Sequence, residues 1–139
     1  MILLDTNVVS EPMRPAPEAR VVDWINAQPL ETLYLSAITV AELRAGVALL
    51  PRGRRRTGLH EDLEKRVLPL FAGRVAAFDL GCTQAYAEVR ERMRRAGQFI
   101  AQIDGYIAAI AATHGFAIAT RDTVPFAASG LPVINPWTA

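Results

Sequence analysis

Four carboxylates in the chain have neighbours that suit chemistry rather than simple solvation. Asp5 ends the apolar run "MILL", and Asp122 follows the apolar run "FAIA". Glu42 lies within a predicted helix, and Asp104 stands among apolar residues in "FIAQIDGYIAAI". A buried carboxylate must be hydrogen-bonded, paired with a cation or bound to a metal, because burying a bare charge is too costly. One aspartate cannot distinguish these cases, so the question is whether the four acids meet.

Each of the four acids also has an ordinary structural explanation. Asp5 could cap a helix, Glu42 stands at a capping-box position relative to Thr39, and Asp122 could be a turn residue. Asp104 could stabilise the N-terminus of a helix. The apolar surroundings of Asp5 and Asp104 weaken these explanations. Glu42 also has a glycine four residues later, where a helical ion-pair partner would stand.

Short apolar segments alternate with amphipathic ones along the chain. The sequence predicts strands at residues 1–5, 32–36, 74–80, 116–120 and 131–135. It predicts helices at residues 17–27, 36–50, 59–73, 82–97 and 102–115, and loops at 10–19 and 121–130. This alternation favours an α/β fold in which helices cover both faces of a mostly parallel five-stranded sheet.

In open sheets of this kind, ligands bind outside the carboxyl ends of the strands. Asp5, Glu42 and Asp122 can converge there, whereas the helix of Asp104 does not directly follow a strand. Clustered acids repel one another, which makes a metal-free site unfavourable. Oxygen ligands without a cysteine or histidine cluster suit Mg²⁺ or Mn²⁺. Such a site suits phosphoryl chemistry.

The length and composition suit one domain that spans residues 1–139. The single cysteine excludes a disulfide framework and a cysteine-based zinc site. No apolar stretch approaches the roughly 20 residues of a membrane span. The N-terminus lacks the positive charge of a signal peptide. We therefore expect a cytoplasmic protein that has no membrane segment.

The net charge is only +1, but the basic residues are unevenly distributed. Eight arginines fall in two short stretches, "RGRRR" at residues 52–56 and "RERMRR" at residues 90–95. Arginine binds phosphate through two parallel hydrogen bonds and stacks on bases, so both stretches suit a nucleic acid. A solvated helix face is an equally ordinary explanation for either stretch alone.

Several motifs in succession resemble those of a known family. "LLDTN", "AEL", "DGYIAAIA" and "ATRDT…F…GLPVINPW" resemble the motifs of PIN-domain ribonucleases. More narrowly, they resemble VapC-type toxins of prokaryotic toxin–antitoxin pairs, in the FitB-like branch. The resemblance runs from residue 2 to residue 137 and rests on the order and spacing of the motifs.

This resemblance implies a three-layer α/β/α fold and a metal site. It implies that Mg²⁺ or Mn²⁺ is bound by an acidic quartet, which consists of Asp5, Glu42, Asp104 and Asp122. Thr6, Asn7 and Thr120 match supporting positions beside these acids, where they would orient the ligands. We therefore expect a metal-dependent endoribonuclease that acts as the toxin of a toxin–antitoxin pair.

The expected partners are RNA, a cognate antitoxin protein and a second copy of the chain. Arg52, Arg54, Arg55 and Arg56 are the candidate RNA-binding residues. The antitoxin and the homodimer follow from the resemblance. A physical argument supports the antitoxin independently, because an arginine would suit a pocket of four acids.

Three other functions stay open at this point. A non-catalytic protein could keep the fold for a DNA-bound or RNA-bound complex, although it would have no use for four clustered acids. A DNA-directed nuclease would use the same acids, and nothing in the chain selects for the 2′-hydroxyl group of RNA. A Rossmann-type nucleotide-binding module is disfavoured, because "DTNVVSEP" after the first strand contains no glycine.

Overall fold

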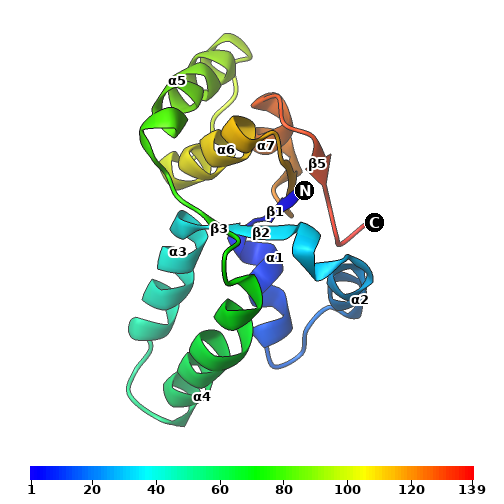
Figure 1. The fold of residues 1–139 in the computed structure, drawn as a ribbon, viewed down its shortest axis with the longest axis vertical. Helices are drawn as coiled ribbons and strands as arrows, with labels where there is room; N and C mark the ends of the chain where they lie inside the picture. Colours follow the sequence, from blue (N-terminus) through cyan, green and yellow to red (C-terminus); the bar gives the residue numbers. More distant parts are fainter.

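A sheet of five parallel strands forms the centre of the molecule (Figure 1), as a computed structural model of residues 1–139 shows. The strands are β1 (Ile2–Leu4), β2 (Leu33–Ser36), β3 (Val75–Ala76), β4 (Ala117–Ala119) and β5 (Val133–Ile134). Their order is β3-β2-β1-β4-β5, and each neighbouring pair is parallel. The chain moves outward from β1 in both directions, so a crevice is expected between the carboxyl ends of β1 and β4.

Seven α-helices surround this sheet. They are α1 (Thr6–Ser10), α2 (Ala19–Ala27), α3 (Ala37–Ala48), α4 (Arg54–Asp62), α5 (Leu80–Arg95), α6 (Gln102–His114) and α7 (Thr123–Ala128). Tighter or wider helical turns also occur, at Glu11–Met13, Leu30–Thr32, Leu63–Val67 and Leu68–Phe71. No helix has both the length and the apolar composition that crossing a membrane requires.

The two faces of the sheet support separate hydrophobic cores. Leu3 and Leu4 are both buried, and they enter opposite cores because successive side chains of a strand alternate between the faces. On the side of Leu3, the core is covered by α5, α6 and α7. On the side of Leu4, it is covered by α1, α2, α3 and the turns that follow α4. The predicted three-layer α/β/α architecture is therefore confirmed.

The ends of the long helices also follow the sequence. Gly115 ends α6 in a left-handed conformation with φ of +69°, and Gly97 has φ of +64° just after α5. A left-handed residue after a helix is favourable for glycine because it has no Cβ. Figure 1 shows α3 and α4 as an antiparallel hairpin on one side of the sheet and α5 and α6 on the other.

Several predicted boundaries are wrong. The strand predicted at residues 74–80 covers only Val75–Ala76, and the loop predicted at residues 121–130 contains α7. Residues 6–10 form α1, where the sequence predicted no helix, because five residues are too few to display a helical period. The helix predicted at residues 59–73 begins at Arg54 as α4 and continues through irregular turns to Phe71. Three arginines of the stretch "RGRRR" therefore form the first turn of a helix rather than a loop.

Candidate active site

Asp5 lies at the carboxyl end of β1 and is only 3% exposed. Its Oδ1 accepts a hydrogen bond from the backbone N–H of Thr6 at 2.8 Å, which caps α1. Its Oδ2 accepts from Thr120 Oγ1 at 2.8 Å and from Asn7 Nδ2 at 3.3 Å. Burial raises the pKa of Asp5, the bonds from Thr120 and Thr6 oppose that rise, and the nearby Asp122 and Glu42 charges add to it. The carboxylate is thus held by neutral donors and has no cationic partner.

Asn7 connects this buried acid to the exposed Asp122. Its Nδ2 lies 3.3 Å from Asp5 Oδ2 and 3.2 Å from Asp122 Oδ2, so one amide faces two carboxylates. Its Oδ1 accepts from the backbone N–H of Arg121 at 3.2 Å. Thr120 Oγ1 accepts from the backbone N–H of Asp122 at 2.9 Å. The loop after β4 is therefore fixed against the start of α1.

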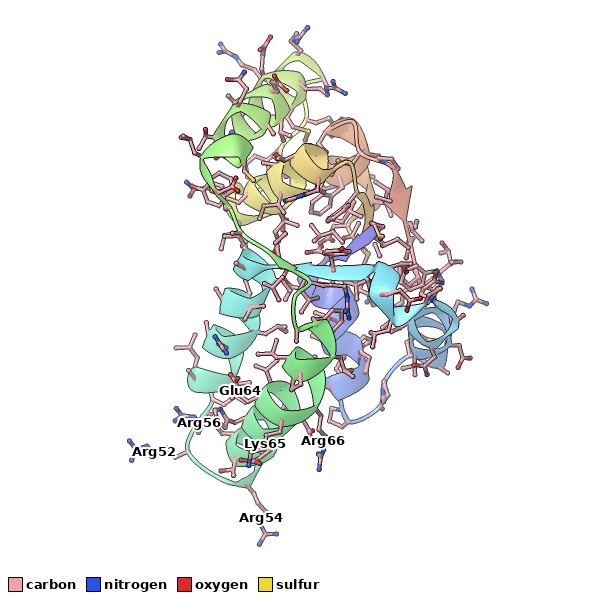
Figure 2. All side chains as sticks on the ribbon, viewed as in Figure 1. Arg52, Arg54, Arg56, Glu64, Lys65 and Arg66 are labelled. Carbon is pink, nitrogen blue, oxygen red and sulfur yellow. The ribbon has the colours of Figure 1, made fainter.

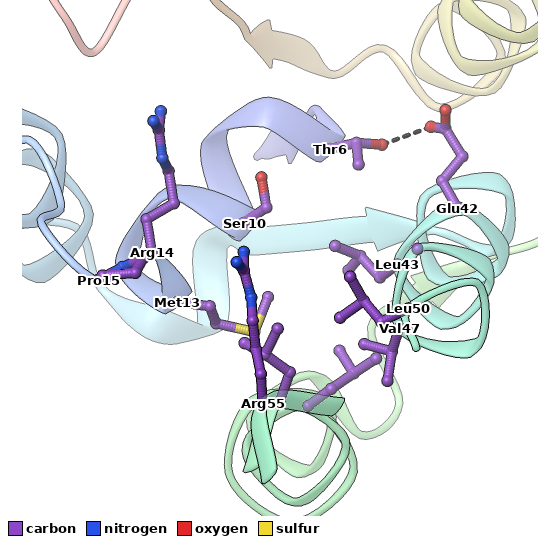
Figure 3. A pocket seen from close by; sticks show the side chains of 13 residues that line it. Thr6, Ser10, Met13, Arg14, Pro15, Glu42, Leu43, Val47, Leu50 and Arg55 are labelled. Carbon is purple, nitrogen blue, oxygen red and sulfur yellow. Dashed lines mark hydrogen bonds between the residues drawn. The ribbon is translucent and has the colours of Figure 1, made fainter. Parts of the chain in front are cut away.

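Glu42 reaches the site through Thr6. Thr6 Oγ1 donates to Glu42 Oε1 at 2.5 Å (Figure 3). The same hydroxyl lies 3.1 Å from Thr39 Oγ1. The helix cap of α3 is Ser36, whose Oγ accepts from the backbone N–H of Thr39 at 2.9 Å. The capping-box explanation of Glu42 relative to Thr39 is therefore wrong. Sequence reasoning also missed the contact between the hydroxyls of Thr6 and Thr39, because no local pattern joins α1 to α3.

Asp104 lies in the first turn of α6 and faces the same edge of the sheet. The pKa of its carboxyl group is raised from the ordinary value of 3.8 to about 6, first by burial and then by the charges of Asp5, Asp122 and Glu42. Because all three act on Asp104, the four acids share one region, which topology alone did not establish.

The four carboxylates do not form a finished coordination shell. No three Asp, Glu, His or Cys side chains lie close enough together to hold one metal ion. The donor set is nevertheless all oxygen, with Asp5 buried and Glu42 and Asp104 partly buried. No ion pair involves any of the four acids. That chemistry suits a hard divalent cation such as Mg²⁺ or Mn²⁺.

The arginines of "RGRRR" lie at the far end of the α3–α4 hairpin and point in different directions. Figure 2 shows Arg54 pointing away from the molecule. Arg52 and Arg56 line a hollow that also contains His60 and the Arg44–Glu64 ion pair, in which Nε and Oε1 are 2.8 Å apart. Arg55 lines a different cavity. The arginines of "RGRRR" therefore lie on two surfaces of the hairpin, which the sequence alone could not show.

The cavity beside Arg55 is a groove of about 560 Å³ that reaches Glu42. Leu43 and Val47 of α3, and Leu50 just after it, project into the groove (Figure 3). Glu42 and Thr6 line it as well, together with Arg14. The apolar stripe of α3 is therefore only partly used by the core, and the rest faces an open groove.

Comparison with known proteins identifies the family. A PIN domain family model matches residues 2–129. The chain is 63% identical to plasmid stability protein StbB of Pseudomonas syringae pv. tomato over 139 residues, which is 100% of both chains. It is 56% identical over 137 residues to VapC ribonuclease Y4jK of Sinorhizobium fredii, covering 99% of this chain and 98% of that one. It is also 56% identical to toxin FitB of Neisseria gonorrhoeae, with 99% of both chains covered.

A solved structure of FitAB bound to the IR36 DNA fragment matches with a TM-score of 0.95 and 54% identity, over 99% of this chain and 96% of that one. The chain therefore belongs to the PIN-domain family, and within it to the group of VapC and FitB toxins of toxin–antitoxin systems. Nucleases of this family generally use divalent metal ions. The resemblance recognised from the sequence motifs is thus confirmed.

The raised pKa of Asp104 predicts how the stability of the metal-free protein varies with pH. Since the folded-state pKa exceeds the ordinary value, the folded protein binds the proton more tightly than the unfolded chain does. Ionising Asp104 therefore destabilises the fold as pH rises from 3.8 through about 6. In EDTA, the melting temperature of Asp104→Asn relative to wild type should increase over this range and then level off.

The matched control for that measurement is Asp23→Asn, which makes the same change at an exposed position on α2. Its melting temperature should differ from that of wild type by a nearly constant amount at every pH. A constant difference for Asp104→Asn as well would show that burial and the other three charges do not raise the pKa of Asp104.

Proposed function

We propose that this chain is the toxin of a toxin–antitoxin pair and that it hydrolyses RNA phosphodiester bonds with Mg²⁺ or Mn²⁺. One observation carries the proposal. Four carboxylates from separate elements act on one another at the carboxyl edge of the sheet, and they are Asp5, Glu42, Asp104 and Asp122. The names of the relatives, VapC ribonuclease and toxin FitB, support this activity.

In this proposal the acids divide into two roles. Asp5, Asp104 and Asp122 hold a divalent ion, while Glu42 holds a second ion or positions water. When bound, the ion neutralises charge on the phosphate and makes a water molecule more acidic. Thr120 and Asn7 hold the Asp5 carboxylate, and Thr6 holds Glu42, through the hydrogen bonds described above. These neutral donors keep the acids oriented without cancelling their charge.

RNA is the proposed substrate, and Arg52, Arg54, Arg55 and Arg56 are proposed to contribute to its binding. All four side chains are free of ion pairs, so their charge is available to phosphate groups. The structure favours contributions at more than one face of the hairpin, because Arg52 and Arg56 line one hollow and Arg55 another.

The proposed protein partners are a cognate antitoxin and a second copy of the chain. We also propose that residues 1–139 form a single domain and that the protein is cytoplasmic. The groove beside α3 supports the antitoxin. An apolar partner segment could bury Leu43, Val47 and Leu50 while its arginine approached Glu42. The homodimer rests on family membership rather than on a particular contact.

A second function is favoured by one finding. A relative's solved structure is described as FitAB bound to a DNA fragment. The alternative is thus a non-catalytic or DNA-directed PIN-fold protein that works with a partner on nucleic acid. Cleavage assays on RNA and on DNA separate this alternative from the ribonuclease.

The charge of Asp5 is the most direct test of catalysis. Purified wild-type protein should cleave structured RNA with Mg²⁺ or Mn²⁺, and EDTA should stop the reaction. Asp5→Asn keeps the shape but replaces one acceptor oxygen by an amide donor and removes one ligand charge. It should lower the single-turnover rate by about 100-fold or more while the protein stays folded by circular dichroism. Equal rates for the two proteins would contradict the assignment.

The toxin role predicts a genetic result. Expression of this chain alone in its native host should arrest growth, and co-expression with the reading frame immediately upstream should relieve the arrest. Asp5→Asn provides the control, because it should be harmless alone and should still co-purify with the partner. Harmless wild-type protein with no co-purifying neighbour would favour a stand-alone nuclease.

A further inference from the structure

Arg121 stands immediately before Asp122 but lies against an aromatic ring instead of an acid. Its Cζ is 5.1 Å from the centre of the Trp137 ring, and the side chain is exposed. Its backbone N–H is fixed by Asn7 Oδ1 at 3.2 Å. Trp137 follows β5, and Arg121 follows the neighbouring strand β4, so both lie at the edge that contains the acids.

The guanidinium of Arg121 is not used to neutralise the acidic site. It forms no ion pair, although its sequence neighbour is Asp122. Trp137 therefore holds the Arg121 guanidinium near the acids while it forms no ion pair with them, since a cation over an indole face is itself favourable.

A second arginine converges on the same tryptophan. Arg20, an exposed residue of α2, donates from Nη1 to the Trp137 carbonyl oxygen at 3.3 Å and also forms no ion pair. Trp137 is half-buried against the core that contains Leu4 and Val21, which makes it a rigid support. The two arginines and the tryptophan form a platform, which we call the Arg20–Trp137–Arg121 platform.

A cation beside an acidic edge has a clear use if the substrate is a polyanion. Four carboxylates repel a strand of phosphates, so an unpaired guanidinium next to them would lower the cost of its approach. Arginine offers a planar pair of donors that matches a phosphate. We propose that Arg121, positioned by Trp137 and assisted by Arg20, binds an RNA phosphate beside the one that is cleaved. This inference rests on the proposed ribonuclease function.

The experiment measures RNA binding separately from cleavage. Fluorescence anisotropy of a labelled single-stranded RNA, in EDTA and over a range of KCl concentrations, compares wild type with Arg121→Ala, Arg121→Lys and Arg20→Ala. Arg74→Ala is the matched control, because Arg74 also lies over an aromatic ring, that of Phe71, and is free of ion pairs, but it precedes β3 at the opposite edge of the sheet.

Arg121→Ala should weaken RNA binding by roughly tenfold and reduce the slope of log Kd against log salt by about 1. Arg121→Lys should keep most of the slope and lose part of the affinity, because lysine retains the charge but not the paired donors. If Arg121→Lys keeps most of the slope, the weaker RNA binding of Arg121→Ala comes from the lost charge and not from unfolding. In cleavage assays with Mg²⁺, the loss should fall more on KM than on kcat. Arg20→Ala should have a smaller effect in the same direction.

Other outcomes would overturn the inference. Equal affinity and slope for Arg121→Ala and Arg74→Ala would leave Arg121 as a packing partner of Trp137. Unchanged RNA binding with weakened binding to the co-expressed upstream protein would assign the platform to the protein partner. If wild-type protein neither bound nor cleaved RNA, the ribonuclease proposal would fail together with this inference. Normal cleavage by Arg121→Ala would remove only the inference.

Discussion

The repulsion among four carboxylates is the constraint on which the rest of the structure depends. Asp5 is buried, Asp104 is partly buried, and both face like charges; burial and repulsion each disfavour the ionised carboxylate. The protein opposes this cost with neutral donors, chiefly Thr120, Asn7 and Thr6. An arginine or lysine would be a stronger partner, but its ion pair would neutralise the carboxylates. A site built this way keeps its negative charge available for a cation.

The fold supplies both the crowding and the means to tolerate it. Parallel strands bring the ends of β1 and β4 to one edge, and a bridging amide then spans residues 115 positions apart in the chain, from Asn7 to Asp122. The cations are placed around this edge and not within it. Arg121 is held over Trp137, and Arg55 lies along the groove. The acids therefore lie at the centre of the candidate site, and the arginines lie on the surface around it.

Much of this arrangement could be predicted from the sequence, because its signals are local. All five strands are short apolar runs, and Gly115 marks the end of α6 as a left-handed glycine should. The position of Asp104 was not predictable from topology, since α6 follows another helix and only packing against α5 and the sheet places it. The bonds of Thr6 to Glu42 and of Asn7 to Asp122 join distant segments, so no pattern of spacing reveals them.

The central claim is that the four acids form one cation site, and calorimetric titration of Mn²⁺ into metal-free protein tests it most directly. Wild-type protein should give a saturable isotherm. Replacing Asp5, Asp104 or Asp122 by Asn should weaken binding each time, because each change removes a ligand charge from the same ion. Replacing Glu42 by Gln should also weaken binding, because it removes a neighbouring negative charge. Asp23→Asn on α2 should bind like wild type. The claim would be contradicted by isotherms that are the same for wild type and for all four site variants.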